Sequence, residues 1–350
     1  MRLWLTALCL LGCGTADPPE VVRAAPGPVP DPAVESAPAM DPPSDHEQEP
    51  EIEPTWPGRV EACDLPTPRV GALREGLRYA PGRHLDLALP ASEGPHPWVL
   101  LIHGGGWSAG ERSHLRREME MLAALGFAAA SVDYRLLDAG RPNRWPVQVA
   151  DVRCAVRYLR RRAGSLGLDP ERGAAVGFSA GGYLAEMLGT ASDAEGLDHA
   201  CPDIETSPAV TAVVAYYAPA DLRPEASYSR AADAILTRFL GAPRARVPER
   251  AALASPVVHV DAADPPHLLL HGTRDTVVPL DQSERMRDAL EAAGVHAQLV
   301  VVDGAPHGFR LFWRGERTRP ATCTTVAFLE AALRSPRGAS RSAAASGSRP

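Results

Sequence analysis

Apolar and polar positions alternate along the chain in two recurring patterns from about residue 83 onward. Short runs of apolar residues, many of them β-branched, predict buried strands, and the segment HLDLAL at 84–89 has the period of two of a half-exposed strand. Between these runs lie segments with the 3.6-residue period of helices. The expected strands cover 84–89, 98–103, 127–134, 173–178, 210–218, 267–272 and 297–303, and the expected helices cover about 112–125, 146–164, 180–190, 230–240, 282–293 and 322–333.

The regular succession of strand and helix predicts an α/β fold with a mostly parallel, doubly wound sheet flanked by helices. Two helix starts have local support. Asp281 and Glu284 have the spacing of a capping box, and Pro146 falls in the first turn of its predicted helix, where proline is tolerated. Because such sheets place reactive groups at the carboxyl ends of their strands, we expect the functional residues there.

The N-terminus has the features of an export signal. Arg2 precedes an apolar run over 3–11 that ends in Gly12-Cys13, and this run is too short to span a bilayer. The pattern resembles a bacterial lipoprotein signal, which implies cleavage before Cys13 and a lipid on its thiol. The location expected from this is the periplasmic or cell-surface side of a bacterial membrane. An ordinary secretory signal or a misplaced start remains an alternative.

Charge and proline are concentrated behind this signal. Residues 17–58 contain twelve prolines and ten acidic residues but one arginine, whereas the whole chain of 350 residues has a formal charge of −7. Such a segment cannot bury enough apolar surface to fold and predicts a tether. The expected organisation is a signal at 1–12, a tether at 13–58, a catalytic domain at 59–334 and a disordered tail at 335–350. The charge balance gives no basic face for nucleic acid. No run of eighteen or more apolar residues occurs, so contact with a membrane is expected only through the lipid anchor.

Four cysteines fall in the predicted domain, namely Cys63, Cys154, Cys201 and Cys323. In an oxidising compartment they predict one or two disulfides, although four buried thiols would also fit. Three pairings are possible and the sequence does not choose among them. No Cys/His cluster has zinc spacing, so no metal and no cofactor are expected.

The first candidate reactive group is Ser179, in the sequence Gly-Phe-Ser-Ala-Gly-Gly between a predicted strand and a predicted helix. A nucleophilic serine at such a junction needs a very tight turn, and Gly177 and Gly181 remove β-carbons that would collide there. The turn also directs the amide of Ala180 toward a substrate oxygen.

A second motif, His103-Gly-Gly-Gly-Trp107, follows the predicted strand 98–103. Amides without side chains can converge on an oxyanion, so Gly105 and Gly106 are the expected donors, together with Ala180. We interpret His103 as fixing this loop through a hydrogen bond and not as a catalytic base.

The base and its orienting carboxylate follow the last two predicted strands. His307 is the predicted general base, and Asp275 is the carboxylate that would hold its tautomer. The order Ser179, Asp275, His307 is that of α/β-hydrolases. Asp303 is the rival carboxylate, but Asp275 lies at the end of the preceding strand.

Together the motifs HGGGW, GFSAGG, HGTRDTVVP and APHGF resemble the α/β-hydrolase esterases related to hormone-sensitive lipase and the bacterial acetyl-xylan and feruloyl-type esterases. The resemblance covers about 75–334. It implies hydrolysis of short-chain carboxylic esters through an acyl-enzyme, without metal or cofactor, on a small-molecule or polysaccharide-linked ester. Alternatives are an amidase, formamidase or peptidase of the same fold, or a non-catalytic tethered binding domain.

Little sequence precedes the first predicted strand, so the roof of the pocket must come from elsewhere. The candidate roof segments are 191–209 and 219–263. Tyr216, Tyr217, Tyr228 and Phe239 lie within or beside them, as core residues or as substrate contacts.

Overall fold

The computed structural model describes residues 55–138, 143–198, 201–312 and 315–334. The predicted signal with Cys13, most of the predicted tether and the predicted tail lie outside the described residues. Within the described residues, no helix combines the length and apolar character needed to cross a membrane.

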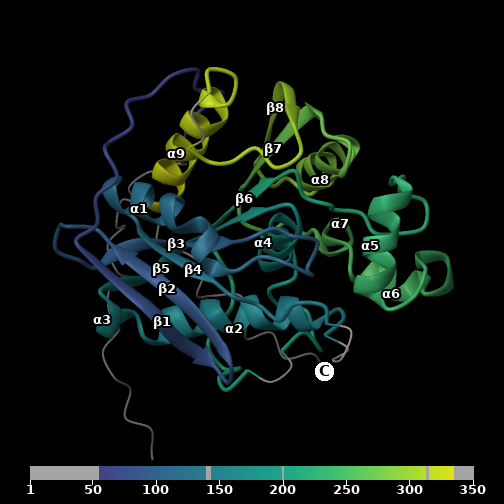
Figure 1. The fold of residues 1–350 in the computed structure, drawn as a ribbon, viewed down its shortest axis with the longest axis horizontal. Coiled ribbons are helices and arrows are strands. Elements are labelled where there is room, and N and C mark those ends of the chain that lie inside the picture. The colour runs from purple at the N-terminus through teal and green to yellow at the C-terminus, as the bar shows by residue number, and fades with distance from the viewer. Residues whose placement is uncertain (1–54, 139–142, 199–200, 313–314, 335–350) are drawn as a thin grey trace, which may run out of the picture. The chain divides into compact units, whose positions relative to one another are not determined.

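Eight strands form one sheet in the order β1-β2-β4-β3-β5-β6-β7-β8 (Figure 1). The strands from β4 to β8 along this order run parallel, while β2 pairs antiparallel with both β1 and β4. Their bounds are β1 Ala72–Ala80, β2 Arg83–Leu89, β3 His96–Ile102, β4 Ala128–Val132, β5 Leu168–Phe178, β6 Ala212–Tyr216, β7 His267–Arg274 and β8 Ala297–Pro306. The predicted α/β-hydrolase fold with a mostly parallel sheet is confirmed.

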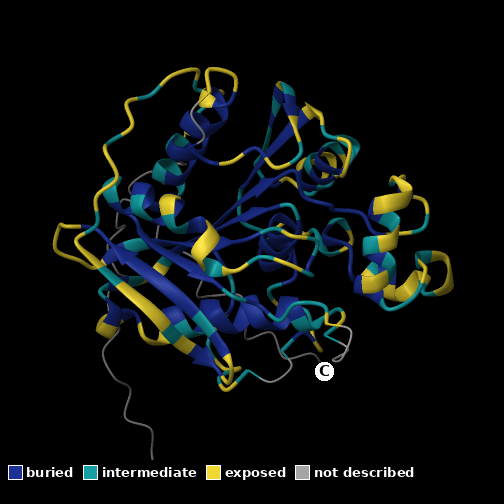
Figure 2. Ribbon diagram, viewed as in Figure 1, coloured by how far each residue is buried: buried dark blue, intermediate teal, exposed yellow. Residues whose placement is uncertain are grey.

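The helices are α1 Arg116–Ala124, α2 Val147–Arg161, α3 Ala163–Leu166, α4 Ala180–Thr190, α5 Arg230–Leu240, α6 Pro248–Leu253, α7 Pro256–His259, α8 Asp281–Ala292 and α9 Arg319–Arg334, with 3-10 turns η1 Arg112–Leu115 and η2 Arg244–Arg246. Apolar side chains of α1 and α9 join the core on one face of the sheet, and those of α2, α4 and α8 join the core on the other. The central strands β3, β4 and β6 are buried on both sides (Figure 2). This explains their nearly continuous apolar sequences.

Two local expectations are wrong. No capping box starts α8, because Leu280 occupies the N-cap position without a side-chain cap. Asp281 is the first helical residue, and its carboxylate accepts a hydrogen bond from Arg285 Nε at 3.1 Å, one turn further along. The helix α2 begins at Val147, with Pro146 at its N-cap and not inside its first turn.

Two disulfides join the four cysteines of the domain, Cys63 to Cys323 and Cys154 to Cys201. The first fastens the segment before β1 to α9. Trp56, placed by the sequence in the tether, also packs on this domain, since its ring stacks on His296 with centroids 4.7 Å apart.

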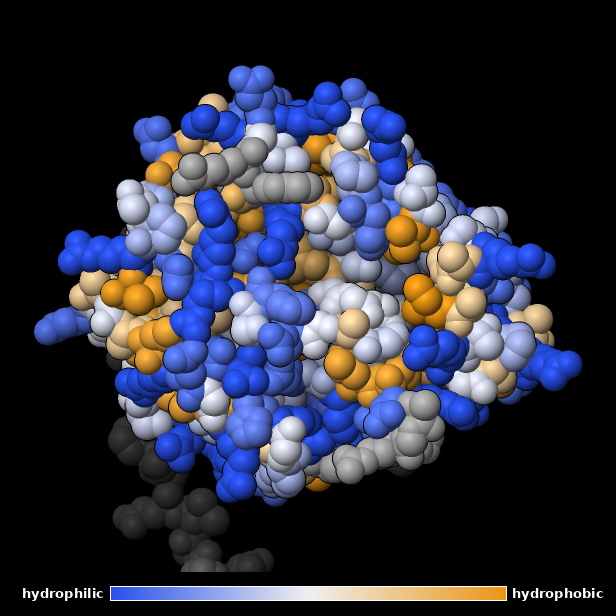
Figure 3. Space-filling view, in the orientation of Figure 1, coloured by the Kyte–Doolittle hydropathy of each residue, from blue (hydrophilic) through white to orange (hydrophobic). Residues whose placement is uncertain are grey.

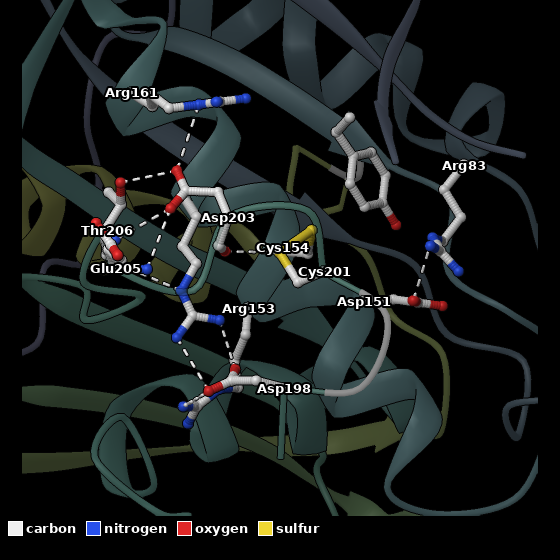
Figure 4. Close-up of a disulfide and its surroundings, with 12 residues drawn as sticks. Arg83, Asp151, Arg153, Cys154, Arg161, Asp198, Cys201, Asp203, Glu205 and Thr206 are labelled. Carbon is white, nitrogen blue, oxygen red and sulfur yellow. Dashed lines mark hydrogen bonds and ion pairs between the residues drawn. A yellow bond between two sulfur atoms is a disulfide. The ribbon is translucent and has the colours of Figure 1, made fainter. Parts of the chain in front are cut away.

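The second disulfide fixes the segment 191–209, of which residues 199 and 200 are not described, against α2. Arg153 Nε lies 2.7 Å from a carboxylate oxygen of Asp198, and Arg161 pairs with Asp203 at 3.3 Å (Figure 4). These contacts hold the segment against α2.

The surface seen in Figure 3 carries hydrophilic side chains interspersed with small apolar areas.

Candidate active site

Ser179 occupies the junction between β5 and α4, with φ 55° and ψ −118°. A positive φ is strained for a residue with a β-carbon and is the feature of a nucleophile elbow. A β-carbon at Gly177 would lie 2.0 Å from the carbonyl oxygen of Gly181, and one at Gly181 would lie 2.2 Å from that of Ile102. The predicted need for both glycines is therefore confirmed.

Ser179, His307 and Asp275 form one chain of hydrogen bonds, although they come from three separate strand ends. The Oγ of Ser179 lies 2.9 Å from Nε2 of His307, and Nδ1 of His307 lies 2.6 Å from Oδ2 of Asp275. A carboxylate only accepts, so Nδ1 carries the proton and Nε2 is free to accept from the serine hydroxyl. This arrangement can deprotonate a serine and hold the resulting imidazolium.

The carboxylate of Asp275 is buried and held from several sides. Its Oδ1 accepts hydrogen bonds from the amides of Val277 and Val278, at 2.8 and 2.9 Å. Burial raises the pKa of Asp275, but hydrogen bonds from His271 and His307 outweigh burial and hold the pKa below its usual value. Asp275 is therefore ionised at neutral pH.

The rival carboxylate lies elsewhere. Asp303 accepts a hydrogen bond from the Thr273 hydroxyl at 3.1 Å, on an exposed part of the strand ends. The structure brings Asp275, and not Asp303, to the imidazole of His307.

The glycine-rich loop after β3 lies directly against the serine turn. A β-carbon on Gly104 would be 3.3 Å from Cβ of Ser179. Gly105 and Gly106 have φ of 116° and 57°. No backbone carbonyl of a described residue accepts from the amides of Gly105, Gly106 or Ala180. All three residues line the same pocket and can donate to an oxygen placed there.

His103 fixes the glycine-rich loop through a hydrogen bond, as the sequence predicts. Its Nδ1 lies 2.8 Å from the carbonyl oxygen of Gly104, and its ring stacks on Tyr134 with centroids 4.3 Å apart. Burial lowers the pKa of His103, so the ring is neutral and fixes the loop.

A cavity of about 520 Å³ opens over Ser179, a size typical of small-molecule sites. The segment 219–263 contributes to its wall, as expected, through Pro219, Tyr228, Ala232, Ile235 and Leu236. The expectation that 191–209 also forms part of the roof is wrong, because no described residue of this segment lines the cavity. That segment is held on α2 by the ion pairs and the disulfide described above.

The four aromatic residues considered for the pocket divide evenly. Tyr217 and Tyr228 line the cavity. The Tyr216 hydroxyl instead lies 2.8 Å from that of Thr325, inside the core. Phe239 stacks on Trp107 with centroids 3.9 Å apart and supports the wall from behind.

One residue that supports the site, His271, was not singled out by the sequence. His271 is fully buried, with Nε2 3.4 Å from Oδ2 of Asp275 and 3.0 Å from the carbonyl oxygen of Val278. Tyr217, which the sequence did single out for the pocket, also supports the site: its ring packs edge-on against His307, with centroids 4.6 Å apart. The sequence feature that could have identified His271 is a histidine inside an otherwise apolar strand, four residues before Asp275.

Across the described part of the chain, no three His, Cys, Asp or Glu side chains gather closely enough to bind a metal ion.

Comparison with known proteins agrees with this geometry. The model of the BD-FAE family matches residues 85–290. Esterase LipC of Mycobacterium tuberculosis is 32% identical over 246 residues, which are 69% of this chain and 60% of LipC. The chain thus spans about 60% of the length of this relative.

This chain aligns with two solved structures over nearly the whole length of each. A truncated carbohydrate esterase from gut microbiota has a TM-score of 0.64 and 26% identity, covering 76% of this chain and 99% of that one. Esterase 2 of Thermogutta terrifontis, phosphonylated by sarin, has a TM-score of 0.62 and 27% identity, covering 76% and 94%.

Proposed function

Since the chain belongs to the BD-FAE family, we propose that it is a serine hydrolase of short-chain carboxylic esters. The observation that carries this proposal is the hydrogen-bonded chain from Ser179 through His307 to Asp275. The names of the relatives, which include an esterase and a carbohydrate esterase, support esters as the substrates.

In the first half of the proposed reaction, Oγ of Ser179 attacks the ester carbonyl carbon while Nε2 of His307 takes the hydroxyl proton. Asp275 stabilises the imidazolium that forms. The tetrahedral intermediate then breaks its bond to the alcohol oxygen, and His307 protonates that oxygen. The alcohol leaves and the acyl group remains on Ser179.

In the second half, His307 takes a proton from water, and the resulting hydroxide attacks the acyl carbonyl. The bond to Oγ of Ser179 breaks, and His307 returns the proton to this oxygen. The products are a carboxylic acid and the free enzyme.

The amides of Gly105, Gly106 and Ala180 stabilise the oxyanion in both halves. Ala180 is the first residue of α4, so its amide has no intrahelical partner and lies at the positive end of the helix dipole. Removing one donor of such a site typically costs about 100- to 1,000-fold in kcat.

The substrate proposed for this site is a small-molecule or polysaccharide-linked ester with a short acyl chain. A cavity of about 520 Å³ has room for a short acyl group and part of an alcohol.

The test is turnover of 4-nitrophenyl esters of increasing acyl length. Ser179→Ala is expected to lower kcat by about 10⁴-fold or more. Asp275→Asn is expected to lower it by about 10³- to 10⁴-fold, because the imidazole loses its preferred tautomer. The matched control Asp303→Asn removes the rival carboxylate and should leave kcat within about twofold, because Asp303 does not contact His307.

If the folded wild-type protein cleaves no ester, the proposal fails. If Asp303→Asn causes the loss and Asp275→Asn does not, the assignment of the carboxylate fails. Labelling gives an independent check, because a fluorophosphonate should add its mass to the peptide that contains Ser179 in the wild type but not in Ser179→Ala.

We also propose that the full chain is exported and held on a bacterial membrane by a lipid on Cys13. The apolar run over 3–11 followed by Gly12-Cys13 supports this location. After expression in a bacterial host, the wild type should sediment with membranes and carry a lipid mass on the residue at the new N-terminus. Cys13→Ser should remain uncleaved or appear in the soluble fraction, and a wild-type protein without lipid would contradict the proposal.

A further inference from the structure

The charged groups around the cavity are asymmetric. Among its described lining residues, one side chain carries a permanent positive charge, Arg310, and none is an aspartate or glutamate. Most of the remaining wall is apolar or glycine. A permanent cation beside a wall of this kind biases the site toward negatively charged ligands.

Arg310 follows the general base by three residues and is available to a ligand. Its side chain is 50% exposed. One of its Nη2 protons is donated to the carbonyl oxygen of His114 at 2.9 Å, which anchors the guanidinium at the rim beside η1. A guanidinium has five N–H donors, so this contact leaves most of them for another acceptor.

Among the described residues, Arg310 forms an ion pair with one carboxylate, that of Glu118, and this pair is weak. The shortest separation is 3.8 Å, between Nε and Oε1, which is too long for a hydrogen bond. Glu118 is buried beneath the rim, and burial raises its pKa. The positive charge of Arg310 is therefore offset only in part, at a residue that lines the cavity.

We propose that the ester hydrolysed at this site carries a carboxylate, and that the guanidinium of Arg310 binds it. This inference rests on the proposed ester hydrolase function. Arginine suits this task because its planar fork can donate two parallel hydrogen bonds to a carboxylate. The carboxylate belongs to either the acyl group or the alcohol, and both places leave the ester carbonyl over Ser179.

The experiment compares kcat/KM for two matched pairs of substrates. The hemiadipate and hexanoate esters of 4-nitrophenol differ by a carboxylate on the acyl side. 4-Acetoxyphenylacetate and its methyl ester differ by a carboxylate on the alcohol side. Within each pair the ratio of anionic to neutral substrate is measured for the wild type, Arg310→Gln, Arg310→Lys and Arg117→Gln. Arg117→Gln is the matched control, because it removes the same charge from the neighbouring exposed surface of α1 without touching the cavity.

We expect Arg310→Gln to lower the ratio about tenfold for one of the pairs, while the neutral substrate of that pair keeps its kcat/KM and reports correct folding. Arg310→Lys should keep part of the preference, and Arg117→Gln should keep all of it. Raising NaCl from about 20 mM to about 500 mM should lower the wild-type ratio, because Arg310 is half-exposed and screened by salt.

An unchanged ratio in Arg310→Gln for both pairs overturns the inference while the ester hydrolase function stands. A loss equal to that in Arg117→Gln also overturns it, since only the net charge would matter. If the wild type hydrolyses none of the four esters, the proposed function itself has failed.

Discussion

Glu186 provides a sharp test of the interior of this domain. It lies on α4, seven residues after Ser179, and is fully buried. Neither of its carboxyl oxygens has a hydrogen-bond partner among the described residues. Burial raises the pKa of Glu186 well above its usual value, which favours the protonated side chain in the folded protein.

This shift has a definite sign in its effect on stability. Between the ordinary glutamate pKa of about 4.3 and the raised folded pKa, the folded state binds one more proton than the unfolded state. The free energy of unfolding therefore falls as pH rises through this window, by up to about 1.4 kcal/mol per pH unit. From pH 6 to pH 8 the limit is roughly 3 kcal/mol.

Glu186→Gln keeps the shape of the side chain and removes its ionisation. Urea unfolding of the wild type and the variant at several pH values is the assay, because groups that titrate alike in both proteins cancel in the difference. We expect the variant to gain stability over the wild type steadily as pH rises. Glu249→Gln, at an exposed glutamate of α6, is the matched control and should show no such trend. A difference for Glu186→Gln that does not change with pH would refute the reasoning.

Three further predictions concern the turn, the disulfides and the triad. In thermal unfolding, Gly181→Ala should lower the free energy of unfolding by more than about 3 kcal/mol or abolish folding, because its β-carbon would lie 2.2 Å from a backbone oxygen of β3. Gly164→Ala is the control: a β-carbon there meets nothing within 4 Å, so this variant should be neutral or stabilising by up to about 1 kcal/mol. Replacing Cys63 and Cys323 together by serine should lower the free energy of unfolding by about 2–5 kcal/mol in urea, because this bridge spans 260 residues; a loss below about 1 kcal/mol would contradict this account. Because the pKa of Asp275 lies below its usual value, this carboxyl should stay ionised across the acid limb of log kcat/KM against pH and add no second proton to it; a slope of two would mean that the carboxyl titrates in this range.

The central strands were predictable from sequence because they are buried on both faces. The predicted 98–103 and 267–272 coincide closely with β3 and β7, whose side chains at 98–102 and 268–270 alternate between the two cores. The strand β1 was not predicted, for the opposite reason. It is an edge strand with most of its residues exposed, and Gly76 interrupts its pattern at a register shift. Its place depends on pairing with β2, which no local pattern records.

The site divides in the same way. Ser179, Asp275 and His307 follow strands whose carboxyl ends meet at one edge of a parallel sheet, so their order along the chain was enough to expect them together. The placement of 191–209 depends instead on Arg153, Asp198 and a disulfide to α2. Arginines at helical spacing are ordinary surface residues until a partner from a distant loop is known. The sequence could therefore not tell a roof over the pocket from a segment held against α2.

Arg310 shows how these two kinds of information combine. Its position three residues after His307 fixes it near the reacting atoms, just as the parallel sheet fixes the base. Its role, however, depends on what surrounds it: a weak pair with a buried glutamate, one anchoring carbonyl, and a cavity wall whose described residues include no carboxylate. In the proposed hydrolase, the sheet would therefore determine the chemistry that this site can perform, while side chains brought in by the loops and short helices around it would determine which esters it accepts.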